Sequence, residues 1–174
     1  HGAVATLNRM DAPVIMAING SAAGAGFSLA IAGDFAIAGE SAKFSMAYTA
    51  AGLSPDGSSS YFLPRRVGMM RARELMMTNR RLSAAEALDW GLLNQVVDDD
   101  KLLDAALELA GKLARGPTRA YGQVKQLLNS SFETGLETQM EYETAGIAAM
   151  ASSADGKEGV RAFLDKRKPE FRGC

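Results

Sequence analysis

The feature that most constrains this chain is a run from Ala12 to Gly33 in which no side chain carries a charge. A run of this length could span a membrane as one helix. However, four glycines and the turn pair Asn19-Gly20 break it into pieces with the lengths of a strand, a tight turn and a helix. We therefore expect the run to lie at the centre of a folded core, and we expect no membrane partner.

Strand and helix patterns alternate through the first third of the chain. Pro13 to Ile18 is an apolar strand, Gly26 to Ala32 a helix of small residues, and Asp34 to Ala38 and Ala42 to Met46 are short strands. This succession predicts an α/β fold. The first strand is expected to be fully buried, so it needs neighbouring strands, which indicates that an upstream segment is absent.

The rest of the chain has helical patterns, which begin at Arg71. A capping box from Ser83 to Glu86 opens a helix that Gly91 can end, and apolar residues recur at helical spacing from Leu102 to Leu113. Further helices are predicted over residues 119–129, 133–150 and 157–166. We divide the chain into an α/β core, residues 1–116, and a C-terminal helical region, residues 117–174.

Composition excludes several classes of function. With 174 residues, 47% of them hydrophobic, the chain can bury a sizeable core. Nineteen basic and twenty acidic residues give a net charge of -1, which argues against a nucleic-acid partner. The single cysteine, Cys174, cannot form an intrachain disulfide, and no signal peptide is visible, so we expect a cytoplasmic protein.

A glycine-rich stretch from Gly20 to Ser28 lies between the first strand and the helix after it. Its glycines allow a sharp turn, so the amides of Ala25 and Gly26 can point outward at the positive end of the helix. Leu29 stands where a dinucleotide fingerprint needs its third glycine, and no Gly-Lys-Ser/Thr closes a P-loop. The stretch alone is compatible with an anion site or with a simple packing turn.

Several motifs together resemble one family. The string Pro13 to Gly26, followed by Gly33-Asp34 and Ala42-Lys43-Phe44, is similar to the crotonase (enoyl-CoA hydratase/isomerase) superfamily, and so are Leu82 to Leu92 and Glu158 to Arg167. The resemblance implies a crotonase-like β-β-α spiral core, partial here, with a C-terminal helical region that forms trimers and contacts coenzyme A. It also implies an acyl-CoA thioester substrate, a homotrimer or hexamer, and neither a metal nor a cofactor beyond the coenzyme A of the substrate.

The resemblance implies roles for the glycine-rich turn. In the family, one backbone amide of this turn stabilises the enolate of the thioester, and the matching residue is Ala25, between the substrate-binding Gly24 and Gly26. The second amide of the family's oxyanion hole comes from a segment upstream of the residues present here. Two donors aimed at the developing negative charge make removal of an α-proton feasible.

Two positions depart from the family's hydratases. Those enzymes carry glutamates at the positions that Ser28 and Tyr48 occupy here. A hydroxyl and a phenol titrate far from neutral pH, so hydration by the usual carboxylate pair is doubtful. We expect Ser28 and Tyr48 to contact the substrate instead.

One carboxylate, Asp56, stands where a subset of the family has its catalytic acid or base. Pro-Asp-Gly alone would be a surface turn. With Gly52 to Ser58 and Leu63 to Gly68, however, it is similar to the ring-1,2-epoxyphenylacetyl-CoA isomerases and to some Δ3,Δ2-enoyl-CoA isomerases. This implies that Asp56 moves a proton along the acyl chain, with Tyr48, Phe62 and Phe27 as candidates for an apolar wall.

Two other functions stay open. The run Met70 to Arg80, with Tyr48 and Asp56, also resembles 4-chlorobenzoyl-CoA dehalogenase, in which the matching aspartate is a nucleophile and an upstream histidine is the base. His1 lies near that position, although a terminal histidine can be incidental. Alternatively, the protein binds acyl-CoA without catalysis, and Asp56 is only a turn residue.

Phe163 and Lys166 match positions that help to hold the adenine and phosphates of coenzyme A in the family. A lysine near the end of a helix is also favourable by itself, because it faces the negative end of the helix dipole. Both interpretations of this pair remain open.

Overall fold

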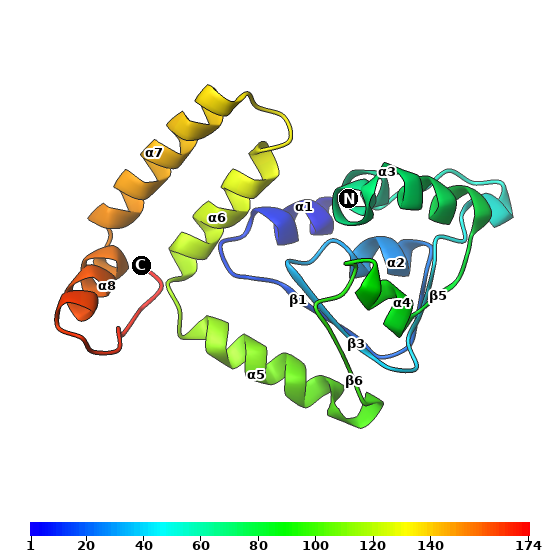
Figure 1. Ribbon diagram of the computed structural model, residues 1–174, viewed down its shortest axis with the longest axis horizontal. Coiled ribbons are helices and arrows are strands. Elements are labelled where there is room, and N and C mark those ends of the chain that lie inside the picture. Colours follow the sequence, from blue (N-terminus) through cyan, green and yellow to red (C-terminus); the bar gives the residue numbers. More distant parts are fainter. The chain divides into compact units, whose positions relative to one another are not determined.

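A computed structural model describes residues 1–174, which form two compact units (Figure 1). The first consists of His1–Asn8 and Val14–Leu109, and the second of Arg9–Pro13 and Ala110–Cys174. The boundary therefore falls inside helix α5 (Leu102–Ala114), earlier than the division after residue 116 that the sequence indicates. None of the helices has both the length and the hydropathy of a membrane span.

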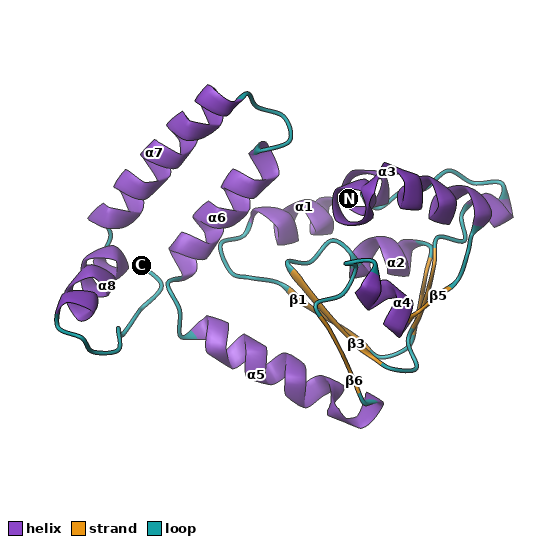
Figure 2. Cartoon of the chain, in the orientation of Figure 1, coloured by secondary structure: helices purple, strands orange, loops and turns teal.

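Two three-stranded sheets form the frame of the first unit (Figure 2). One has the order β1-β3-β6 and is wholly parallel, whereas in the other, β2-β4-β5, the last pair is antiparallel. The predicted α/β class is confirmed. The strands are β1 (Ile15–Ile18), β2 (Ser21–Ala23), β3 (Phe35–Gly39), β4 (Lys43–Ser45), β5 (Leu82–Ser83) and β6 (Gln95–Val97).

Strand β1 is not fully buried, contrary to the sequence expectation. It pairs only with β3, so it is an edge strand, and its residues are half-buried except for the exposed Ala17. The continuous apolar pattern correctly predicted a strand. Its burial depends on how many neighbours the strand has, which periodicity does not report.

Helices α2 (Ala25–Ala30) and α4 (Ala84–Asp89) of the first unit agree with the predicted ones, whereas α3 (Ser59–Thr78) does not. This helix begins at Ser59, before the predicted start near Arg71. Pro64 and Gly68 are residues that usually break helices, so the sequence before Arg71 does not look helical. In the structure the chain kinks at Gly68, and the helix continues beyond it. The helices and 3-10 turns of this unit are α1 (Gly2–Arg9), α2 (Ala25–Ala30), η1 (Thr49–Ala51), α3 (Ser59–Thr78), α4 (Ala84–Asp89) and η2 (Asp99–Lys101).

The main core of the first unit lies between its two sheets. Helix α4 contacts strands of both sheets, and α2 packs on β2 and α3. Phe27 of α2 meets Phe44 of β4 with ring centroids 5.7 Å apart, and both rings are buried. Because α2 is anchored by this buried ring, the glycine-rich turn that precedes it has a fixed position.

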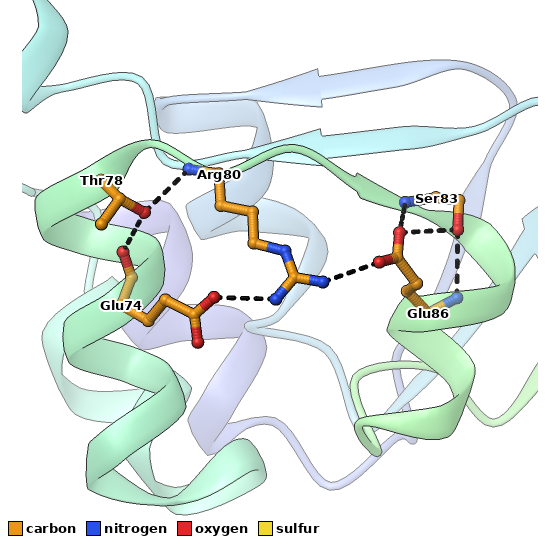
Figure 3. A network of polar contacts seen from close by, with 5 residues as sticks. All are labelled: Glu74, Thr78, Arg80, Ser83 and Glu86. Carbon is orange, nitrogen blue, oxygen red and sulfur yellow. Dashed lines mark hydrogen bonds and ion pairs between the residues drawn. The ribbon is translucent and has the colours of Figure 1, made fainter.

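A polar network joins the end of α3 to the start of α4 (Figure 3). The guanidinium of Arg80 binds Glu74 at 2.7 Å and Glu86 at 2.8 Å. Glu86 also completes the predicted capping box, because it accepts from the amide of Ser83 while Ser83 Oγ accepts from the amide of Glu86. The short segment between the two helices is therefore held at both ends.

The second unit contains α6 (Thr118–Ser130), α7 (Leu136–Ser152) and α8 (Ala154–Leu164), with α6 beside α7 (Figure 1). All three correspond to predicted helices. The C-terminal tail folds back on α8, where the carboxylate of Asp155 accepts from the amides of Arg172 and Gly173 at 2.8 Å each. Asp155 is only 5% exposed, so these largely buried bonds hold the tail against α8.

Candidate active site

The glycine-rich turn leads from β2 into α2. Gly24 has φ 52° and ψ -120°, a conformation that glycine adopts at little cost, and its amide donates to Ser45 of the neighbouring strand at 3.1 Å. The backbone amide of Ser28 donates the first intrahelical hydrogen bond, to the carbonyl of Gly24. The amides of Ala25 and Gly26 precede it, and both residues are exposed, so these two donors are available to a ligand.

Ser28 lies beneath this turn and is 0% exposed. Its hydroxyl oxygen is 3.3 Å from the carbonyl oxygen of Gly24, 3.1 Å from the hydroxyl of Tyr48 and 3.0 Å from the carbonyl oxygen of Asp56. One buried hydroxyl therefore connects the start of α2 to the two loops that carry Tyr48 and Asp56.

Tyr48 follows β4 and precedes η1. Its hydroxyl donates to Oδ1 of Asp56 at 2.7 Å. Burial raises the pKa of the Tyr48 phenol, and the carboxylate beside it acts in the same direction. The phenol therefore keeps its proton at neutral pH and serves as a donor to the carboxylate.

Asp56 is exposed, and its backbone anchors the turn in front of α3. Its carbonyl accepts from the amide of Ser59 at 3.3 Å and from the hydroxyl of Ser59 at 3.0 Å, besides the bond from Ser28. The carboxyl group therefore stands on a fixed backbone and is open to solvent on one side.

Three residues were expected to form an apolar wall around Asp56, and one of them, Tyr48, contacts it through its polar hydroxyl. Phe27 is fully buried against Phe44, and Phe62 is half-buried in an edge contact with Tyr61. In this chain the carboxyl group therefore has a polar partner and an open side.

Phe163 and Lys166 lie in the second unit, at the end of α8. Phe163 is 81% exposed, and Lys166 is also exposed. The amide of Lys166 donates to the carbonyl of Phe163 at 3.2 Å, which is the usual bonding at a helix end. Their role in holding coenzyme A stays a prediction.

Three supporting residues were not predicted. Ser59 holds the Asp56 turn, and Asn79 donates through Nδ2 to Thr49 Oγ1 at 2.7 Å, next to Tyr48. Ser59 follows Asp56 at the spacing of a hydrogen-bonded turn, which is a usable signal. Asn79 and Thr49 are thirty positions apart, so no local pattern could have paired them.

Residues 3–174, nearly the whole chain, match the sequence model of the enoyl-CoA hydratase/isomerase family. The chain belongs to this family. Its membership of the crotonase superfamily, expected from the motifs, is confirmed. The glycine-rich turn before α2 and the Asp56 turn before α3 are thus parts of a crotonase fold.

Known relatives and solved structures agree with this assignment. The chain is 46% identical to the 1,2-epoxyphenylacetyl-CoA isomerase of Escherichia coli over 98% of its own length and 65% of that protein. It is 37% identical to a carnitinyl-CoA dehydratase of Salmonella agona, over 94% of the chain and 64% of the relative. The chain thus spans slightly less than two thirds of these two relatives.

Crystal structures of the family share the fold. An enoyl-CoA hydratase from Polaromonas sp. JS666 superposes with a TM-score of 0.93 at 39% identity, covering 99% of this chain and 67% of that one. An enoyl-CoA hydratase/isomerase from Cupriavidus metallidurans has a TM-score of 0.92 at 38% identity, covering 98% and 64%. The predicted crotonase-like core with a helical C-terminal part is therefore confirmed.

Proposed function

We propose that the protein is an acyl-CoA double-bond isomerase in which Asp56 shuttles the proton and the amide of Ala25 helps to bind the thioester oxygen. The observation that carries the proposal is the buried hydroxyl of Ser28, which contacts both Gly24 and Asp56. Through it, the turn with free amides and the turn with an exposed carboxylate are parts of one rigid site.

The chemistry needs one base and one group that stabilises an enolate. The carboxylate of Asp56 takes a proton from the carbon next to the thioester or conjugated with it, and the electron pair of that C–H bond delocalises onto the thioester oxygen. The amide of Ala25 donates to this oxygen as its charge develops. The carboxylic acid of Asp56 then returns the proton to another carbon, which shifts the double bond and regenerates the carboxylate.

A single carboxylate is sufficient because only a proton moves. Hydration must in addition position and activate a water molecule, and the positions of the hydratase glutamates hold Ser28 and Tyr48. The name of the E. coli relative also supports isomerisation, and it favours an acyl group derived from phenylacetate. Coenzyme A bound through Phe163 and Lys166, assembly as a trimer or hexamer, and a cytoplasmic location are parts of the same proposal.

The test is the variant Asp56→Asn, assayed with a 3-enoyl-CoA and by exchange of the thioester α-protons in deuterated water. Loss of the general base should lower both rates by about 10²- to 10⁴-fold. Because Asp56 is exposed, the variant should fold normally. Asp89→Asn, at an exposed aspartate at the end of α4, is the matched control and should behave as wild type.

Other outcomes would replace this function. If Asp56→Asn keeps the wild-type rates, the carboxylate is not the base. Binding of acyl-CoA without any exchange would indicate a non-catalytic protein. Release of chloride from 4-chlorobenzoyl-CoA, abolished by Asp56→Asn, would instead identify a dehalogenase with Asp56 as its nucleophile.

A further inference from the structure

The two carboxylate oxygens of Asp56 have different surroundings. Oδ1 accepts the hydroxyl of Tyr48 at 2.7 Å, whereas Oδ2 makes no hydrogen bond within the chain. Because the residue is exposed, Oδ2 is the oxygen that a ligand can reach.

The protons around this carboxylate have a defined direction. An ionised carboxylate can only accept, so the single proton of the Tyr48 hydroxyl lies between its oxygen and Oδ1. The phenol oxygen remains an acceptor, and Ser28 Oγ is 3.1 Å from it. When Ser28 donates to this oxygen, the phenol becomes a better donor to the carboxylate.

The loop that carries Tyr48 is held on both sides by the end of α3. Before Tyr48, the hydroxyl of Ser45 donates to the carbonyl of Asn79 at 3.1 Å, and after it, Nδ2 of Asn79 donates to Thr49 at 2.7 Å. Ala47, directly before Tyr48, has φ 55°, which is uncommon for a residue other than glycine and occurs often at functional sites. The backbone on both sides of Tyr48 is therefore held in place, and its hydroxyl is held by Ser28 and Asp56.

We propose that Tyr48 is a positioning residue that binds Oδ1 of Asp56, so that Oδ2 takes and returns the substrate proton, while Ser28 holds Tyr48 in place. The inference rests on the proposed role of Asp56. In the first step the substrate C–H bond breaks, the Oδ2–H bond forms and the electron pair enters the enolate. In the second step the Oδ2–H bond breaks and a new C–H bond forms.

This arrangement has a measurable consequence. A hydroxyl that donates to one oxygen of a carboxylate fixes the direction of the other oxygen. Without the donor, Oδ1 loses its partner and Oδ2 loses its fixed direction toward the substrate. The rate of proton transfer should therefore fall, while binding of the thioester should not change.

The test is Tyr48→Phe, which keeps the ring and removes only the hydroxyl. We expect kcat for isomerisation at neutral pH to fall about tenfold or more, as for loss of a hydrogen bond to a charged group. KM should stay nearly unchanged, and exchange of the thioester α-protons in deuterated water should slow by the same factor as kcat, because Tyr48 acts on proton transfer and not on binding. Ser28→Ala should lower kcat by less, because the Tyr48–Asp56 bond remains.

Tyr142→Phe, at an exposed tyrosine of α7, is the control and should leave kcat and the exchange rate unchanged. If Asp56→Asn is inactive but Tyr48→Phe has the wild-type kcat and exchange rate, the positioning role is wrong and the proposed function stands. A raised KM with an unchanged kcat would overturn it too, since Tyr48 would then bind substrate directly. If Asp56→Asn is fully active, the proposed function itself fails.

Discussion

At the scale of single residues, both the backbone conformation and the space around Gly57 favour glycine. Its φ is 62°, and a Cβ at this position would lie 3.0 Å from Cβ of Ser28. Ser28 is fully buried and contacts both Tyr48 and Asp56, so it has little room to move. A glycine next to the proposed base therefore leaves room for the buried side chain of Ser28.

The variant Gly57→Ala should be less stable and less active. A left-handed conformation costs a residue with a Cβ about 1–2 kcal/mol, and the contact with Ser28 adds to this. Urea denaturation would measure the loss. Gly20→Ala is the control, because a Cβ there meets nothing within 4 Å, and it should be close to neutral. Equal stability of the two variants would show that Gly57 is not constrained.

At the scale of elements, the junction of α3 and α4 is held by charge. Hydrogen bonds from the amide and hydroxyl of Ser83, followed by that from Arg80, lower the pKa of Glu86 from 4.5 to about 2. The guanidinium of Arg80 also lies 4.9 Å from the ring centroid of Trp90. The junction leads directly from Asn79, which holds the Tyr48 loop, so it supports the candidate site.

Acid should weaken this junction. Because the pKa of Glu86 is lower in the folded state, its ionised form stabilises the fold fully above about pH 4.5, and this contribution is lost as the pH falls toward about 2. For Glu86→Gln, the free energy of unfolding should be lower than wild type at neutral pH, and the difference should shrink over this window. Denaturation at a series of pH values measures it. Glu108→Gln, at an exposed position of α5, should show a pH dependence parallel to wild type.

At the scale of the whole molecule, the two units are stabilised by different kinds of contact. The first unit buries Phe27, Phe44 and neighbouring apolar side chains between its sheets. Many apolar residues of the second unit are exposed, among them Leu128, Leu136 and Ile147, and polar contacts close its end. Asp155 holds the tail, and Lys125 is largely buried with its Nζ 3.2 Å from the carbonyl oxygen of Ala12.

Removal of the tail contact should expose the end of the chain. Asp155→Ala deletes the acceptor of two backbone amides, and a hydrogen bond to a charged group is typically worth about 1.5–3 kcal/mol. We expect lower stability and faster hydrogen exchange of residues 170–174. Arg172→Ala keeps the backbone amide and should leave the tail protected. A protected tail in Asp155→Ala would mean that other contacts hold it.

Much of the fold was predictable because it depends on local patterns. The apolar run predicted β1, the capping box at Ser83 predicted α4, and helical spacing predicted α5. The prediction was wrong at the start of α3, which was expected near Arg71, because Pro64 and Gly68 lie inside the helix, where Gly68 kinks it. Strand β2 was missed because it is too short to stand out from the glycine-rich stretch.

The sequence by itself determined the class of fold, the family, and the chemical groups at the candidate site: the turn at Ala25, Ser28, Tyr48 and Asp56. Only the tertiary structure decided how these groups meet. The bonds of Ser28 to Tyr48 and Asp56 join residues 20 and 28 positions apart. Such contacts depend on how the parallel strands and the helices between them place separate loops, and local periodicity carries no information about that placement.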